Sequence, residues 1–215
     1  MRFFLSLFCN MGQVFSGRNL LWHLVAIVLT YILVVSGFDW FYFVHTRGPE
    51  VITILFPAVI LGAYVPIFLP LFLLAGGYWN KSANSIRAGW ILIQAQLIAE
   101  LVSFFYKALT GRVSVRFAEV GTDTSRMFRF GFLRGGVFWG WPSSHTTLAF
   151  ATAFTMMALF PRSKTIRILM LAYAFYIGIG VSVTIHWFSE FVAGGIFGTL
   201  VAAVVAKNTL GNKAA

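Results

Sequence analysis

The sequence predicts an all-α fold, a bundle of six transmembrane helices, and two observations support this prediction. Of the 215 residues, 59% are hydrophobic and only 10% are charged, whereas soluble domains carry about a quarter charged residues. Apolar runs also recur at roughly the 20-residue length that an α-helix needs to cross a bilayer. A soluble globule, a disordered chain and a disulfide-stapled secreted domain are therefore excluded, and Cys9, the single cysteine, has no partner for an intrachain disulfide.

Six segments are long and apolar enough to span the membrane: Leu20–Phe38, Val51–Tyr78, Ala88–Leu109, Ser143–Phe160, Ile168–Ile185 and Trp187–Ala206. The second is long enough to tilt, and its three prolines favour kinks. The sixth contains Gly194 and Gly198, a spacing that lets two helices approach closely. Packing inside the bundle and dimerisation explain this spacing equally well.

The first 19 residues precede the predicted transmembrane domain. Phe3–Cys9 is apolar, but no small-residue cleavage site follows it, so we expect no cleaved signal peptide. We expect residues 1–19 to form an interfacial amphipathic lead-in. Residues 20–206 then form one transmembrane domain, and residues 207–215 form a cytoplasmic tail.

The distribution of charge predicts the orientation of the six spans. Six crossings place both termini and two loops on one side, which carries nine basic residues and no acidic one. An excess of lysine and arginine marks the cytoplasmic side, so we expect a bacterial inner-membrane protein with both termini in the cytoplasm. The nine residues are Arg2, Arg18, Lys81, Arg87, Arg162, Lys164, Arg167, Lys207 and Lys213.

The long loop Thr110–Trp141 on the opposite side is also basic. It carries five arginines, against Glu119 and Asp123 as its only acidic residues; the arginines are Arg112, Arg116, Arg126, Arg129 and Arg134. Membrane topology does not explain this cluster, so we expect an anionic ligand at the extracytoplasmic end of the bundle. Binding to anionic lipid headgroups without chemistry is the alternative.

Two helix ends on this side have residues suited to binding phosphate. Lys107 and Arg112 flank the turn that ends the third span and can donate to one phosphate group, although cations at membrane helix ends are common. The fourth span opens with Pro142, Ser143 and Ser144. Proline and serine are typical of a helix start, whose free N–H groups bind anions. A simply capped helix is the alternative here.

Two histidines lie at the same predicted depth. His145 opens the fourth span, and His186 and Glu190 open the sixth. The spacing of four residues puts the imidazole and the carboxylate on one helical face, so the carboxylate can fix the tautomer of His186 and leave its other nitrogen as a nucleophile. Together the two histidines predict phosphoryl transfer: one imidazole attacks phosphorus and the other protonates the departing oxygen. No usual metal-ligand set is present, and we expect no metal or cofactor.

These residues resemble the motifs of the type 2 phosphatidic acid phosphatase (PAP2) superfamily, membrane lipid phosphatases related to vanadium haloperoxidases. The family has the motifs Lys-x6-Arg-Pro, Pro-Ser-Gly-His and Ser-Arg-x5-His-x3-Asp. Lys107, the run Pro142–His145 and the pair His186 and Glu190 resemble parts of these motifs in the same order. The resemblance implies that His186 is the nucleophile, His145 the general acid, Glu190 the residue that orients His186, and Lys107, Ser143 and Ser144 the phosphate-binding residues.

The sequence also departs from the family pattern. The two motif arginines are replaced by Ser114 and Gly180, the motif glycine by Ser144 and the motif aspartate by Glu190. Losing both arginines removes charge-assisted contacts worth about 1.5–3 kcal/mol each. We therefore expect loop arginines to replace them as phosphate ligands: Arg112 together with one or more of Arg126, Arg129 and Arg134.

Glu100 lies two helical turns before Lys107 within the third span. An ionisable residue at that depth is a functional candidate. A structural hydrogen bond to a neighbouring helix is an equally good explanation.

The resemblance implies a metal-independent phosphatase that hydrolyses a lipid phosphate or diphosphate of the outer leaflet through a phosphohistidine. The residues do not choose among phosphatidic acid, phosphatidylglycerophosphate, a lipid A phosphate and a polyprenyl diphosphate. A lipid phosphotransferase and a non-catalytic lipid-phosphate-binding or transport protein are the alternatives. We expect the bilayer and a lipid phosphate as partners and no nucleic acid, and the sequence does not indicate an oligomeric state.

Overall fold

The computed structural model describes residues 2–115 and 122–210, and within them the chain is all-helical. The α-helices are α1 (Arg2–Val14), α2 (Leu20–Val35), α3 (Phe38–Thr46), α4 (Pro49–Leu55), α5 (Pro57–Trp79), α6 (Ala83–Thr110), α7 (Ser144–Leu159), α8 (Lys164–Thr184) and α9 (Phe188–Leu210), and a 3-10 helix, η1 (Gly17–Asn19), joins α1 to α2. The expected kink in the second span is found where α4 ends and Pro57 begins α5.

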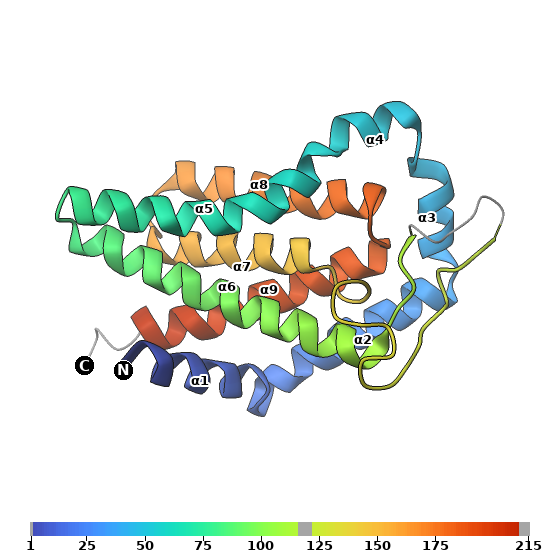
Figure 1. Ribbon diagram of the computed structural model, residues 1–215, viewed down its shortest axis with the longest axis horizontal. Helices are drawn as coiled ribbons and strands as arrows, with labels where there is room; N and C mark the ends of the chain where they lie inside the picture. The colour runs from blue at the N-terminus through green and yellow to red at the C-terminus, as the bar shows by residue number, and fades with distance from the viewer. Residues whose placement is uncertain (1, 116–121, 211–215) are drawn as a thin grey trace.

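Helix α7 occupies the middle of the bundle and packs against α9, α8, α6 and α5 (Figure 1). The start of α1, the end of α9 and the turn from α5 to α6 lie at one end of the bundle (Figure 1). The helix α3, the kinked segment α4 and the loop between α6 and α7 lie at the other end, which we call the loop end. Helix α1 packs against α9 and α6, and its position relative to a membrane stays a prediction.

Five helical segments among the described residues are long and apolar enough to cross a membrane. They are Gly17–Val35, Pro49–Trp79, Ala83–Thr110, Lys164–Thr184 and Phe188–Thr209. Helix α7 has only 16 residues, which is shorter than a spanning helix needs. Five of the six expected spans are therefore found at that length.

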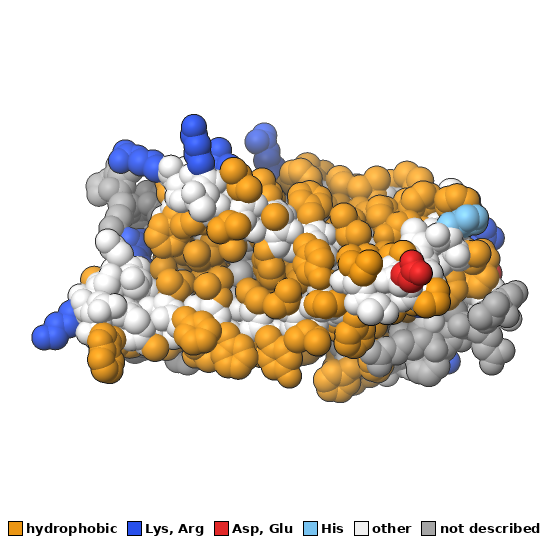
Figure 2. Space-filling model, turned by 90° about the horizontal axis from the view of Figure 1, so that it is seen from above, with side chains coloured by type: hydrophobic (Ala, Val, Ile, Leu, Met, Phe, Trp, Pro, Cys, Tyr) orange, Lys and Arg blue, Asp and Glu red, His pale blue; other side chains and the backbone are white. Residues whose placement is uncertain are grey.

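The outer surface fits a membrane protein. Figure 2 shows one face that is mostly hydrophobic, with lysine and arginine side chains gathered at the end that holds the chain termini. Large apolar side chains such as Phe72 and Trp79 are 70% and 88% exposed, which a water-soluble surface would not favour. Helix η1, which holds Arg18, joins α1 to α2 about midway along the bundle (Figure 1), so Arg18 does not lie with the other basic residues.

Two glycines of α9 allow it to pack closely on α7. A Cβ atom on Gly198 would lie 2.4 Å from the carbonyl oxygen of Thr147, and one on Gly194 would lie 2.9 Å from that of Ser143. The backbone N–H of Ser143 also donates to the carbonyl of Glu190 at 3.2 Å. The glycine spacing is therefore used inside the bundle, and it joins the starts of α7 and α9.

The loop between α6 and α7 is fixed to the end of α6. Helix α6 ends at Gly111, which adopts a left-handed conformation with φ of 49°, as expected for a glycine after a helix. Backbone N–H groups of Arg129, Gly131 and Leu133 then donate to carbonyls at the end of α6. The indole of Trp187 donates to the carbonyl of Val113 at 2.9 Å, which holds the start of the loop against α9.

We predict that Gly198→Ala destabilises the protein by about 1–3 kcal/mol, because the new methyl group overpacks the contact between α7 and α9. Gly76→Ala is the matched control, since a Cβ atom there meets nothing within 4 Å and alanine favours a helix. Thermal unfolding in detergent should give a lower Tm for the first variant only. Equal Tm values for the two variants would contradict the packing described here.

Candidate active site

The start of α7 places His145 at the loop end of the bundle. Ser143 is the N-cap of this helix, and its Oγ accepts the backbone N–H of Thr146 at 3.3 Å, as serine does at helix starts. Ser144 and His145 follow in the first turn. Gly62 of α5 leaves room for the imidazole, because a Cβ atom there would lie 3.2 Å from Cδ2 of His145.

The start of α9 fixes the second imidazole. His186 precedes the helix, and its Nδ1 lies 2.5 Å from Oε2 of Glu190. Both residues are buried, with exposed fractions of 5% and 1%. This hydrogen bond occupies Nδ1 and leaves Nε2 as the nitrogen available to a ligand.

The two histidines line one cavity. Their ring centroids are 5.8 Å apart, and the cavity that both rings line has a volume of about 200 Å³. Since a water molecule takes up about 30 Å³ of liquid, the cavity has room for a phosphate group. The residues that line it are Glu100, Phe104, Lys107, Phe138, Trp139, Ser144, His145, Ile185 and His186.

A hydrogen-bonded group around Ser144 forms the α6 side of this cavity. The ammonium of Lys107 donates to Oγ of Ser144 at 2.7 Å and approaches the carbonyl of Phe138 at 3.4 Å. The hydroxyl of Ser144 donates to Oε1 of Glu100 at 3.2 Å. Because that hydroxyl has one proton, Ser103 donates to Ser144 in their 2.8 Å contact. Lys107 retains a third N–H for a ligand.

Arg112 lies in a buried ionic network behind the cavity. Its Nη2 donates to Oδ2 of Asp39 at 2.6 Å and to the carbonyl of Ser125 at 2.8 Å. Its Nη1 donates to Oγ of Ser189 at 2.6 Å. Asp39 also accepts the backbone N–H and the hydroxyl of Ser189. The network thus joins α3, the loop and the first turn of α9.

This network reaches His186 through Glu190. Nε of Arg112 lies 3.8 Å from Oε1 of Glu190, while the other carboxylate oxygen of Glu190 binds His186. A charge pair this deep in the protein interacts strongly. Asp39, Arg112, Glu190 and His186 therefore form one continuous line of alternating acidic and basic groups.

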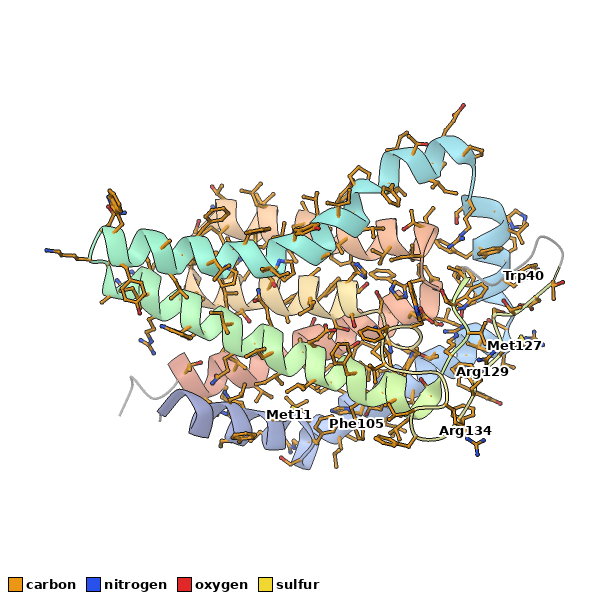
Figure 3. The ribbon with its side chains drawn as sticks, viewed as in Figure 1. Met11, Trp40, Phe105, Met127, Arg129 and Arg134 are labelled. Carbon is orange, nitrogen blue, oxygen red and sulfur yellow. The ribbon has the colours of Figure 1, made fainter. Side chains whose placement is uncertain are left out.

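The structure does not bring the expected loop arginines to the cavity. Arg129 and Arg134 are exposed, and Figure 3 shows both on the outer loop, away from the start of α7. Arg126 is also exposed and donates to the carbonyl of Val35, whereas Arg112 is engaged by Asp39. Arg116 lies outside the described residues. Among the described residues that line the cavity, Lys107 is the one lysine or arginine.

One further expectation needs correction, and the packing at Gly180 explains one departure from the family pattern. Ser143, expected to bind phosphate, is fully buried, and its hydroxyl caps α7 instead of lining the cavity. Gly180, which stands where the family has an arginine, packs against α5: a Cβ atom there would lie 2.3 Å from Cβ of Ala58. No side chain fits at this position, so the kinked α4–α5 segment occupies the space that an arginine would need.

Sequence reasoning missed Asp39 and Ser189. Asp39 lies in the predicted first outer loop, and no local pattern links it to Arg112, which is 73 positions away. Arg47 lies in the same predicted outer loop. Its guanidinium donates to the carbonyl of Thr184 at 2.7 Å and lies 4.4 Å from the ring centre of Phe43. Burial lowers the pKa of Arg47 to about 10, which leaves it charged at neutral pH.

The described residues contain no cluster of metal-ligating side chains. In residues 2–115 and 122–210, no three histidine, cysteine, aspartate or glutamate side chains gather so as to hold a metal ion. The titratable groups that line the cavity or bond to a residue that lines it are two imidazoles, two carboxylates and one ammonium group: His145, His186, Glu100, Glu190 and Lys107.

Comparisons with known proteins identify the family. Over 99% of its length the chain superposes on 95% of a transmembrane PAP2-type phosphatidylglycerolphosphate phosphatase from Bacillus subtilis, with a TM-score of 0.53 and 15% sequence identity. This similarity shows a shared fold. A comparison with curated proteins gives no match. Residues 88–213, more than half of the chain, match the PAP2 superfamily, and the protein therefore belongs to that superfamily.

Proposed function

We propose that this protein is a phosphatase that hydrolyses a lipid phosphate or diphosphate through a phosphohistidine. The observation that carries the proposal is the cavity shared by His145 and His186, whose ring centroids are 5.8 Å apart. The bond from His186 to Glu190 and the ammonium of Lys107 beside the cavity add to it. Membership of the PAP2 superfamily supports the same class of reaction.

In the first step, Nε2 of His186 attacks phosphorus, and the bond from phosphorus to the lipid oxygen breaks. His145 gives its proton to that oxygen, so a lipid phosphate leaves as the alcohol and a lipid diphosphate leaves as the lipid monophosphate. Lys107 and the N–H groups at the start of α7 offset the negative charge on the phosphoryl oxygens. Glu190 stabilises the positive charge that develops on His186.

In the second step, water attacks the phosphohistidine. His145 now accepts a proton from the water, the bond from phosphorus to Nε2 breaks, and inorganic phosphate leaves. Both histidines are then in their starting protonation states. If an acceptor lipid replaces water in this step, the same site performs phosphate transfer, so the geometry fits both a hydrolase and a phosphotransferase.

The proposal places the cavity at the extracytoplasmic end of the membrane domain. Most of the basic residues predicted to be cytoplasmic, among them Lys81, Arg167 and Lys207, belong to elements at the end opposite the cavity, which favours this orientation. We take α7 as the sixth crossing, because it lies inside the bundle and needs no lipid-facing length of its own. Both termini are then cytoplasmic in the inner membrane of a bacterium.

A lipid phosphate is the proposed substrate class. The structural neighbour is described as a phosphatidylglycerolphosphate phosphatase, which supports lipids as substrates. Phosphatidic acid, phosphatidylglycerophosphate, a lipid A phosphate and a polyprenyl diphosphate are the candidates. A lipid-phosphate-binding or transport protein without catalysis is the second candidate function, and one observation favours it: Lys107 is the one lysine or arginine among the described residues that line the cavity.

The first test is phosphate release from a panel of these lipids in detergent, with a metal chelator present. We expect release by the wild type, none above background by His186→Ala, and a rate reduced roughly 10²–10⁴-fold in His145→Ala, as for loss of a general acid. His45→Ala is the matched control, because His45 bonds the carbonyl of Phe41 away from the cavity, and it should retain the wild-type rate.

Each outcome of this panel decides between the candidate functions. Equal release by the wild type and His186→Ala would remove the proposed nucleophile. Binding of the lipids by the wild type with no release from any of them would favour the binding protein.

A second prediction distinguishes Arg112 from Arg129 and Arg134 by the effect of each substitution on turnover. Arg129→Ala and Arg134→Ala should keep turnover within about twofold, because both side chains are exposed away from the cavity. Arg112→Gln should lower kcat at least tenfold and change KM little, since the guanidinium acts through Glu190 and not on the phosphate; breaking such a buried pair removes about 3–5 kcal/mol.

Asp39→Asn tests the same network from its other end. Asp39 holds Arg112, so we expect Asp39→Asn to lower kcat as well, and the double variant to be no worse than Arg112→Gln alone. Glu50→Gln, which changes an exposed acid on α4, is the control. Additive losses of the two single variants would show that Asp39 does not act through Arg112.

A further inference from the structure

An apolar groove leads away from the cavity along the bundle. It has a volume of about 430 Å³ and lies between α5, α6 and α7, where Ala63, Pro66, Ile67, Leu97 and Leu148 line it. Its lining is apolar apart from Gln96 and Glu100. Glu100 also lines the cavity of the two histidines. Glu100 therefore borders both spaces.

This arrangement determines where the phosphate, the linking atoms and the tail of a bound lipid would lie. With its phosphate in the cavity that both histidines line and its hydrocarbon tail in the groove, a lipid would pass its linking atoms beside Glu100. The groove itself supplies apolar contact for a tail. The atoms next to the phosphate are therefore the part of the substrate that Glu100 contacts.

Glu100 is placed to accept a hydrogen bond. Its Oε1 already accepts the hydroxyl of Ser144, whereas its Oε2 is buried and has no hydrogen-bond partner among the described residues. A buried polar atom without a partner is unfavourable by about 1–3 kcal/mol. A carboxylate beside a phosphate site also repels an anion. A hydrogen-bond donor on the ligand would relieve both effects.

We infer that the protein prefers lipid phosphates with a free hydroxyl or amine on the carbon next to the phosphoester carbon, and that Glu100 accepts the hydrogen bond from that group. This inference rests on the proposed function and narrows its substrate class. Ser144 belongs to the same hydrogen-bonded group, because its hydroxyl links Glu100 to Lys107. Glycine, which the family has at this position, could not make that link.

The test uses two lipids that differ in one hydroxyl: oleoyl glycerol phosphate and its deoxy analogue, which lacks the free hydroxyl next to the phosphoester carbon. We expect the wild type to show at least a tenfold higher kcat/KM for the first lipid, the size typical of one hydrogen bond to a charged group. Glu100→Met, which keeps the side-chain length and removes both oxygens, should bring that ratio close to one. Glu100→Gln, which keeps one acceptor oxygen, should retain part of the preference.

Gln96→Met is the matched control, since Gln96 lines the same groove one turn away but bonds Thr152. The ratio of kcat/KM for the two lipids in this variant should equal that of the wild type. Equal kcat/KM of the wild type for the two lipids would overturn the inference and leave the proposed function standing. An equal loss on both lipids in Glu100→Met would also overturn it, because Glu100 would then act only through Ser144 and Lys107. Release from neither lipid by the wild type, nor from any of the wider panel, would overturn the proposed function itself.

Discussion

The close packing of α7 on α9 is the constraint on which the rest of the site depends. Gly194 and Gly198 let the two backbones approach so closely that a Cβ atom at either position would meet a carbonyl oxygen of the α7 segment. The N–H of Ser143 then bonds the carbonyl of Glu190. Since His145 follows Ser143 and His186 lies one turn before Glu190, the same contact that stabilises the bundle sets the distance between the two imidazoles.

The charges of the site are divided between two places. Lys107 faces the cavity, whereas Arg112 lies behind it and pairs with Asp39 and, at longer range, with Glu190. Asp39 compensates the charge of Arg112, which leaves Glu190 to bind His186. Arg112, expected to bind phosphate, thus lies beside the carboxylate that bonds His186. Under the proposed function, a cavity with one ammonium group and one carboxylate, Glu100, would hold a phosphate less strongly than one lined by arginines, so the rest of the substrate would have more influence on selection.

Local sequence patterns predicted the parts of the site that local geometry determines. The spacing of His186 and Glu190 predicted their hydrogen bond, and the run before His145 predicted the start of α7, although the hydroxyl of Ser143 is used as a helix cap. The pairing of Asp39 with Arg112 could not be predicted, because it depends on where α3 and the loop meet. The absence of room at Gly180 likewise depends on packing against Ala58. The helical fold followed from hydropathy, but hydropathy does not show that α7, with 16 residues, is enclosed by other helices.

The most direct test of the central claim is to trap the phosphorylated enzyme. Detergent-solubilised wild type and the His145→Ala and His186→Ala variants would be mixed with a lipid phosphate labelled in its phosphate group, quenched rapidly in alkali, digested and mapped by mass spectrometry. The account predicts an acid-labile phosphate on His186 in the wild type, formed more slowly in His145→Ala and absent in His186→Ala. Phosphate release by the wild type with the label on a different residue, or an undiminished label in His186→Ala, would contradict it.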